Sequence, residues 1–250
     1  MLRDDPFCRN AAVPTYDVVI PCYDRAETVG RAVTSVLAQM FRPERIILVD
    51  DGSSDHTAET ITKLERRHAS VHAVLLPRNA GASAARNAGL GLVRSEWVAF
   101  LDSDDVWVPG AAGAMLAATA GADVVVGKFR RAWRSGILDA PECHWDGGDI
   151  RAALARTGAI GPSWSLIRRS LAVSIAGFDP SFHNCNDWDF YVRAAAAGGR
   201  FVRIDSTIAH YHIAADNRLS LDDLTSRANA RRIQAHPWLA DASPALVNVL

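Results

Sequence analysis

The sequence predicts an α/β protein with a mostly parallel β-sheet covered by helices, and three observations support this class. Short apolar runs alternate with segments whose apolar residues recur at helical spacing. The runs are apolar throughout, as strands buried on both faces of a sheet are. Two of them, 45–51 and 96–102, end abruptly in aspartates. Parallel strands bring such polar side chains to one edge of the sheet, where ligands bind.

The first half of the chain repeats this unit of strand and helix. Pro21 stops a β-branched run, and the next run leads through Gly52 to Ser54 and Asp55, either of which can cap a helix. The elements expected in this half are, in order, strand 16–23, helix 27–40, strand 45–51, helix 54–67, strand 71–76, helix 81–93 and strand 96–102.

The second half is less regular. Its expected elements are helix 109–120, strand 123–129, helix 150–156, strand 163–167, helix 170–176, helix 184–197, strands 201–204 and 208–213, and an amphipathic helix 219–235. Residues 130–148 show no clear period, and a loop of that length is usually functional. Trp133 and Trp145 within it suit either stacking on a sugar or packing in the core. We expect a single domain over residues 1–250.

The composition excludes several classes of function. With 49% hydrophobic residues, the 250-residue chain can bury a large core. A formal net charge of −1 and an isoelectric point near 6.7 give no electrostatic reason for a nucleic-acid partner. The four cysteines form no CxxC pair, which argues against a zinc cluster or a disulfide framework. Residues 1–10 lack the apolar core of a signal peptide, so we expect a cytoplasmic protein, with contact to a membrane surface left open.

An acidic cluster follows the fourth expected strand. Asp102, Asp104 and Asp105 place three carboxylates within four positions. Such charges raise one another's pKa unless a cation neutralises them, and Mg²⁺ or Mn²⁺ prefers oxygen ligands of this kind. The alternative is a solvated turn, because Asp and Ser favour turns. Tyr23 and Asp51 fall at the same edge of the sheet, which favours a binding site there.

Six short motifs together resemble glycosyltransferase family 2, whose members have the GT-A fold. The motifs are 19–25 (VIPCYDR), 48–55 (LVDDGSSD), 78–87 (RNAGASAARN), 100–105 (FLDSDD), 176–179 (AGFD) and 186–189 (NDWD). The resemblance implies transfer of a sugar from a nucleotide-sugar to an acceptor hydroxyl, with inversion at the anomeric carbon. It also implies a nucleotide-sugar-binding half, about residues 16–130, and a smaller mixed acceptor-side half with a C-terminal helix, about residues 131–250.

The resemblance assigns roles on the donor side. The nucleotide-sugar-binding residues that it implies are Pro21, Tyr23, Asp51, Arg86, Asp102 and Ser103. Tyr23 would stack on the base and Asp51 would accept a hydrogen bond from it; the alternatives are a packing aromatic and a helix cap. Arg86 would lie near the diphosphate; its alternative is an exposed helical charge.

Metal and catalytic roles follow from the same resemblance. Asp104 is the expected direct ligand of Mn²⁺ or Mg²⁺, with Asp102 as its partner. A later histidine completes the site in many relatives, and strand alternation puts His210 and His212 on one face, of which we prefer His212. Asp187 matches the family's general base, although it also suits a helix cap.

Asn186 stands where the family has glutamate, which is a departure from the pattern. Losing that charge should remove some of the repulsion that raises the pKa of Asp187. Asp189 is the alternative base.

Two other functions stay open. A phosphatase of the haloacid dehalogenase type has an Asp-x-Asp motif like that at Asp102, but it usually ends the first strand of its domain. A nucleotide-sugar-binding module without turnover is supported by Asn186 alone. For the enzyme, a UDP-sugar is the favoured donor, with GDP- and dTDP-sugars as alternatives. The acceptor is a glycan, lipid-linked or other hydroxyl compound, contacted by residues 130–145 and 163–164.

Overall fold

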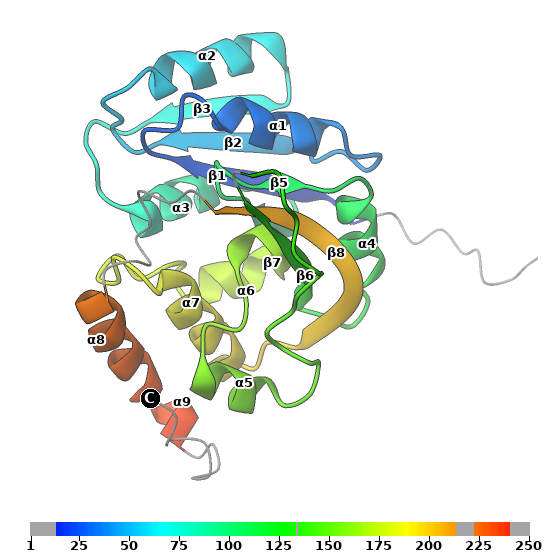
Figure 1. Ribbon diagram of the computed structural model, residues 1–250, viewed down its shortest axis with the longest axis vertical. Helices are drawn as coiled ribbons and strands as arrows, with labels where there is room; N and C mark the ends of the chain where they lie inside the picture. Colours follow the sequence, from blue (N-terminus) through cyan, green and yellow to red (C-terminus); the bar gives the residue numbers. More distant parts are fainter. Residues whose placement is uncertain (1–13, 134, 214–222, 241–250) are drawn as a thin grey trace, which may run out of the picture.

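The computed structural model describes residues 14–133, 135–213 and 223–240, which form one sheet of eight strands with helices around it (Figure 1). The strands are β1 Tyr16–Cys22, β2 Arg45–Asp50, β3 Val71–Leu75, β4 Trp97–Phe100, β5 Val106–Trp107, β6 Val124–Trp133, β7 Ser165–Arg168 and β8 Phe201–Ile213. The helices are α1 Val29–Leu37, α2 Thr57–Arg67, α3 Ala82–Leu90, α4 Ala111–Ala117, α5 Ile150–Arg156, α6 Arg169–Ser174, α7 Asn186–Ala196, α8 Asp223–Gln234 and α9 Pro237–Ala240, with a 3₁₀ turn η1 Pro162–Trp164.

The first four long strands form the predicted parallel sheet. The strand order is β3-β2-β1-β4-β7-β6-β8-β5, and β1 pairs in parallel with both β2 and β4. Right-handed crossovers place α1 and α2 together on one face, while α3 leads back across β1 and β2 on the other. Cys22 lies opposite Asp50, and Val19 lies opposite Phe100. The carboxyl ends of these strands therefore share one edge, as predicted.

The remaining strands make the sheet mixed. β7 runs antiparallel to both β4 and β6, and β8 runs parallel to β6 and antiparallel to β5. The prediction of two strands at 201–204 and 208–213 is wrong, because β8 is continuous and curved (Figure 1). Its polar middle pairs with β6 across shifts in register at Lys128, whose ammonium lies 2.6 Å from the Asp205 carboxylate. This pairing keeps a hydrophilic segment within the strand.

An aromatic cluster fixes α7 against β4. The Phe178 and Phe190 rings stack with centroids 4.1 Å apart, and Phe100 of β4 meets Phe178 edge-on at 4.9 Å. All three side chains are fully buried. Stacked and edge-on pairs add stability beyond their burial. The start of α7, which carries the predicted base, is thereby fixed beside the carboxyl end of β4.

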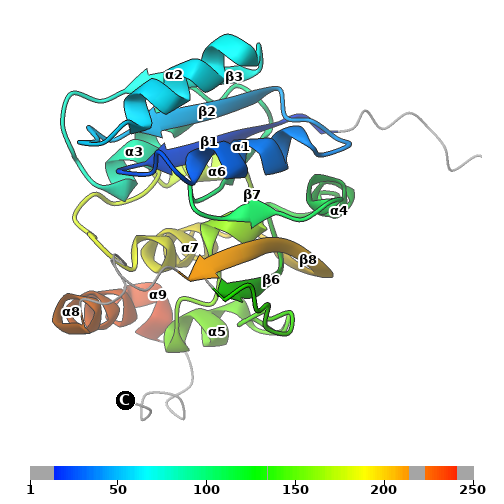
Figure 2. The ribbon, with the colours of Figure 1, turned by 45° about the horizontal axis from the view of Figure 1, so that its top comes forward.

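The C-terminal helices lie at the end of the molecule away from α2 (Figures 1 and 2). α8 packs on α7, and α9 packs on α5. The first residues of the expected helix 219–235 lie outside the described residues, so α8 is compared with that prediction only from Asp223 onward. Among the helices described, none combines the length and apolar character needed to cross a membrane.

Candidate active site

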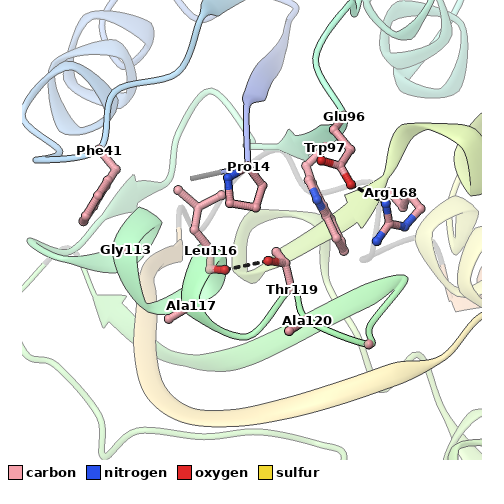
Figure 3. Close-up of a pocket in the computed structure, with 11 residues that line it drawn as sticks. Pro14, Phe41, Glu96, Trp97, Gly113, Leu116, Ala117, Thr119, Ala120 and Arg168 are labelled. Atoms are coloured by element: carbon pink, nitrogen blue, oxygen red, sulfur yellow. Dashed lines mark hydrogen bonds and ion pairs between the residues drawn. The ribbon is translucent and has the colours of Figure 1, made fainter. Parts of the chain in front are cut away.

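The predicted site lies away from a conspicuous cavity. This cavity of about 540 Å³ opens beside the amino ends of β1 and β4 (Figure 3). Pro14, Phe41 and Trp97 line it, together with the ion pair of Glu96 and Arg168. Tyr23, Asp51 and the acidic motif lie at the opposite, carboxyl ends of the strands.

Pro21 and Tyr23 end the first strand. Pro21 is half-buried within β1, and Tyr23 follows the strand with 42% of its surface exposed. A ring so exposed is not part of the core, so the alternative of a packing aromatic is wrong for Tyr23. The ring is accessible to a flat ligand.

Asp51 joins the second strand to the loop before α3. Its Oδ1 accepts from the Ala80 N–H at 2.9 Å and its Oδ2 from the Gly81 N–H at 2.8 Å. Burial raises the pKa of Asp51, and the two backbone N–H groups oppose that shift. Asp51 therefore holds the turn before α3, whereas the first N–H of α2, that of Thr57, is bound by Asp55 at 2.8 Å.

Gly52 explains why two of the sequence motifs occur together. Its φ is +67°, and a Cβ there would lie 2.5 Å from the backbone of Arg78. Only glycine tolerates both the left-handed conformation and this close approach. The 78–81 loop can therefore come close enough for Asp51 to bind it.

Arg86 connects the acidic motif to the start of α7. Its Nη2 donates to Asp102 Oδ1 at 2.7 Å and its Nη1 to Asn186 Oδ1 at 2.9 Å. The guanidinium also lies 5.2 Å from the centroid of the Phe178 ring. Arg86 is only 6% exposed, so the alternative of an exposed helical charge is wrong. In this arrangement Arg86 orients the Asp102 carboxylate and neutralises its charge.

The other carboxylates of the motif have different surroundings. Asp104 is half-buried, with its Oδ2 3.8 Å from Arg25 Nε, and its backbone carbonyl accepts from Arg31 Nη2 at 3.0 Å. Ser103 is buried. Asp104 is thus about as exposed as Asp102 and lies near two arginines, Arg25 and Arg31.

Asp105 faces the interior, where two uncharged groups donate hydrogen bonds to its carboxylate. Its Oδ2 accepts from the Ser163 hydroxyl at 2.6 Å and its Oδ1 from the His212 N–H at 2.9 Å. Burial, followed by the charges of Asp102 and Asp104, raises the pKa of Asp105 well above its usual range. Asp105 consequently ties together the acidic turn, η1 and β8.

The two histidines of β8 have different charged neighbours. Burial lowers the pKa of both imidazoles, helped by Arg130 at His210 and by Arg31 at His212. Since Arg31 also binds the Asp104 carbonyl, His212 is the histidine on the side of Asp104. A lowered pKa keeps the imidazole neutral, as a metal ligand must be.

The described residues contain no cluster of three or more His, Cys, Asp or Glu side chains arranged to hold a metal ion. The donor chemistry of Asp102, Asp104 and His212 nevertheless fits a divalent ion. Mg²⁺ in particular is usually bound by one or two carboxylates together with substrate phosphates and water. The residues thus fit a cation that shares its ligands with a phosphate compound.

Asp187 and Asp102 line the same cavity, of about 190 Å³. Aromatic side chains form much of its wall; they are Phe129, Trp164 and Tyr211. Burial raises the pKa of Asp187, and the neighbouring Arg86 lowers it. Within the described residues its hydrogen bonds come from backbone N–H groups, with that of Trp188 2.9 Å from its Oδ1. The carboxylate is therefore available to a ligand in the cavity.

Asp189 is unsuited to be the base. Its Oδ2 accepts from Arg193 Nε at 2.8 Å, and Nη2 of the same guanidinium forms an ion pair with it at 2.7 Å. It is also 93% buried, with an exposed fraction of 7%. The two carboxylates of the 186–189 motif thus divide into a paired one, Asp189, and one that faces the cavity, Asp187.

The two tryptophans of the irregular stretch have different environments. Trp145 is buried and donates to the Gly148 carbonyl, so it packs in the core. Trp133 is 42% exposed at the end of β6 and donates to Asp139 Oδ1 at 3.0 Å.

The sequence did not indicate the roles of Arg25 and Arg31 at the acidic turn. The position of Arg25, two residues after Tyr23 and just beyond the first strand, could have indicated a place for it in the site.

Comparison with known proteins identifies similar chains. Residues 17–141 match the family described as Glycosyl transferase family 2. The succinoglycan biosynthesis protein ExoU of Rhizobium meliloti is 30% identical over 212 residues, which are 78% of this chain and 61% of ExoU. An Escherichia coli protein named UDP-Glc:alpha-D-GlcNAc-diphosphoundecaprenol beta-1,3-glucosyltransferase WfaP is 34% identical over 93 residues, 36% of each chain.

A solved structure shares the fold. The crystal structure of residues 1–349 of S. aureus TarS in complex with UDP superposes with a TM-score of 0.68 at 19% identity, covering 88% of this chain and 64% of that one. The chain thus spans less than two thirds of the length of these relatives. The structural match confirms the predicted fold class, with one curled mixed sheet.

Proposed function

This chain belongs to glycosyltransferase family 2, and on that premise we propose that it transfers a sugar from a nucleotide-sugar to an acceptor hydroxyl with inversion at the anomeric carbon. The observation that carries the proposal is the cavity shared by Asp102 and Asp187. One carboxylate ends the strand at which donors bind in α/β sheets, and the other begins α7 on the facing side. An acceptor in this cavity would lie between the donor and a base.

Asp187 is the proposed general base. In an inverting displacement, a carboxylate takes the proton of the acceptor hydroxyl while the oxygen attacks from the face opposite the leaving group. The raised pKa of Asp187 makes its carboxylate a stronger base than an exposed aspartate. The charge of Arg86 limits that rise in pKa. The aromatic wall of the cavity suits the apolar face of a sugar ring.

The donor side combines a ring, a carboxylate and a cation site. Tyr23 offers its exposed ring to the nucleobase. Asp51, whose two oxygens also hold the Ala80 and Gly81 N–H groups, lies at the neighbouring strand end. Asp104, Asp102 and His212 would hold Mn²⁺ or Mg²⁺. Such an ion supplies Lewis-acid stabilisation of the charge that develops on the departing diphosphate. Arg86 orients the Asp102 carboxylate for this site through its hydrogen bond to Oδ1.

A UDP-sugar is the favoured donor. TarS was crystallised with UDP and with UDP-GlcNAc, and the name of WfaP gives UDP-Glc as its donor. The names of ExoU, a succinoglycan biosynthesis protein, and of WfaP, a glucosyltransferase acting on a diphosphoundecaprenol-linked sugar, support an acceptor in glycan or polysaccharide synthesis. A lipid-linked acceptor would bring the protein to a membrane surface, while the body of the protein is proposed to lie in the cytoplasm.

The decisive experiment measures nucleotide binding and donor turnover together. Thermal shifts with UDP, GDP and dTDP, each with EDTA or Mn²⁺, should show stabilisation by one nucleotide that increases with Mn²⁺. Asp104→Ala should abolish the increase. Equal shifts for wild type and variant would remove Asp104 from the metal site. Absence of binding by every nucleotide would refute the proposed function.

Asn186 supports a second candidate, a nucleotide-sugar-binding protein without turnover. Its amide has replaced a family carboxylate while keeping the hydrogen bond from Arg86. Hydrolysis of the nucleotide-sugar in the presence of Mn²⁺ distinguishes the two candidates, because slow transfer of the sugar to water requires a working site. Binding of the donor with no release of UDP over many hours would favour the second candidate.

A further inference from the structure

We propose that Arg25 binds the diphosphate of the donor and that, before nucleotide binds, its guanidinium is the counter-ion of Asp104. The inference rests on the proposed function and adds a residue to its site. In the proposed site the nucleobase stacks on Tyr23 and the cation binds Asp104. The diphosphate of the nucleotide therefore lies between these two residues. Arg25 lies in that interval: its Nη1 donates to the Tyr23 carbonyl at 3.3 Å, and its Nε lies 3.8 Å from Asp104 Oδ2.

The loop that carries Arg25 is fixed before any ligand binds. Asp24 adopts a left-handed conformation with φ of 52°, and its Oδ1 accepts from the Ser54 N–H at 2.8 Å. The Arg25 N–H itself donates to Thr57 Oγ1 at 2.7 Å. These bonds fasten the loop after β1 to the loop after β2. A left-handed aspartate costs conformational energy, and the surrounding hydrogen bonds hold it in place.

The side chain of Arg25 is placed differently from that of Arg86. Arg86 is buried, and both of its terminal nitrogens are engaged by Asp102 and Asn186. Arg25 is about one third exposed, and its contact with Asp104 is long for an ion pair. Exposed pairs of this kind contribute only about 0–1 kcal/mol. A diphosphate can therefore displace Asp104 from Arg25 at little cost, whereas displacing Asp102 from Arg86 would break a short bond to a buried guanidinium.

Arg31 adds a second cation at the same turn. It extends from α1 and donates to the Asp104 carbonyl at 3.0 Å. Because it binds the backbone carbonyl, it fixes the turn. Arg31 thus positions Asp104, while Arg25 faces its charged oxygens.

This arrangement couples nucleotide and metal. Without nucleotide, the positive charge of Arg25 opposes a divalent cation at Asp104. A diphosphate attracts the guanidinium through charge-assisted hydrogen bonds, which are stronger than neutral ones. The guanidinium then no longer opposes the cation at Asp104. Each ligand should accordingly strengthen the binding of the other, as linkage requires.

The test compares Arg25→Gln and Arg25→Lys with wild type. Isothermal titration with UDP is carried out in EDTA and in Mn²⁺, and Mn²⁺ binding alone is followed by electron paramagnetic resonance. Loss of one charge-assisted contact should weaken UDP binding in EDTA by about tenfold for Arg25→Gln. Mn²⁺ alone should bind it more tightly than wild type. Arg25→Lys should be intermediate for UDP, because lysine keeps the charge and loses the planar fork.

Arg66→Gln is the matched control. Arg66 is exposed in the last turn of α2, at the opposite edge of the sheet, and its removal changes the net charge by the same amount. It should behave as wild type in both titrations, with all variants checked for an unchanged Tm. Arg25→Gln binding UDP in EDTA as wild type does would overturn the diphosphate contact. Unchanged Mn²⁺ affinity would overturn the counter-ion role. Failure of wild type itself to bind any nucleoside diphosphate would instead refute the proposed function.

Discussion

Asp105 should make the protein less stable as the pH rises, and Asp105→Asn should remove that effect. The carboxyl is fully buried and accepts from two uncharged donors, the Ser163 hydroxyl and the His212 N–H. Burial and the charges of Asp102 and Asp104 raise its pKa well above the ordinary 3.8. The neutral acid is therefore favoured in the folded state, and the ionised form is favoured in the unfolded chain.

The size of the effect follows from proton linkage. Between pH 3.8 and the raised pKa, the folded protein holds one proton more than the unfolded chain. The free energy of unfolding then falls by about 1.4 kcal/mol for each pH unit. The stability that Asp105 contributes is complete below pH 3.8 and is lost as pH rises through the folded-state pKa. Asparagine does not titrate. The free energy of unfolding of the variant should therefore rise relative to that of wild type by up to about 2.7 kcal/mol between pH 5 and 7.

Urea unfolding at pH 5, 6, 7 and 8 measures this difference directly. Other titrating groups cancel because they are the same in both proteins. Asp205→Asn is a control of opposite kind, since Lys128 lowers the pKa of Asp205 and its stabilisation is lost only below pH 3.8. Its curve should run parallel to that of wild type over this range. If the Asp105→Asn curve is also parallel, Asp105 is ionised in the folded protein and the reasoning from burial is wrong.

Three further predictions concern the site. Asp187→Asn should lower kcat by about 10²–10⁴-fold with nucleotide affinity retained. Asp189→Asn should keep kcat but lower the free energy of unfolding by about 1–3 kcal/mol, because its bond to Arg193 is weakened. Steady-state kinetics and urea unfolding measure these effects, and the reverse pattern would make Asp189 the base. Tyr23→Ala should weaken nucleotide binding in calorimetry by about 1–3 kcal/mol without changing Tm, and unchanged affinity would remove the stacking role. Asn186→Glu should move the acidic limb of the pH–kcat profile upward, because a new charge beside Asp187 raises its pKa; a downward shift would contradict this.

The parallel strands were predictable because their apolar runs have few alternatives. β1 to β4 agree with the expected ranges to within a few residues; β1, β2 and β4 are buried on both faces, whereas β3 is a partly exposed edge strand. The break expected within β8 was wrong because residues 205–207 are polar, and local composition does not reveal a pairing with β6. β5, with two residues, was too short to give any period. The wrong prediction for β8 therefore came from a pairing with residues distant in the chain.

The site shows the same division. The strand-end position of Asp51 and Asp104 follows from local sequence, and so does the exposure of Tyr23 after a strand. The bond from Arg86 to Asn186 joins residues 100 positions apart, and no periodicity indicates it. The distinction between Asp187 and Asp189 depends on Arg193, one helical turn after Asp189, whose pairing is compatible with sequence spacing but not required by it. Pairings of this kind require the fold.

The position of Arg86 explains how this site tolerates asparagine at position 186. The guanidinium lies between Asp102 and Asn186, and its charge also lowers the pKa of Asp187. With glutamate at 186, one arginine would face three carboxylates, whereas here it faces two. The amide oxygen still accepts from Arg86, so the orientation of the guanidinium does not require the missing charge. Asn186 therefore keeps the geometry of the site while reducing the repulsion on Asp187, and retention of a working base is the expected consequence.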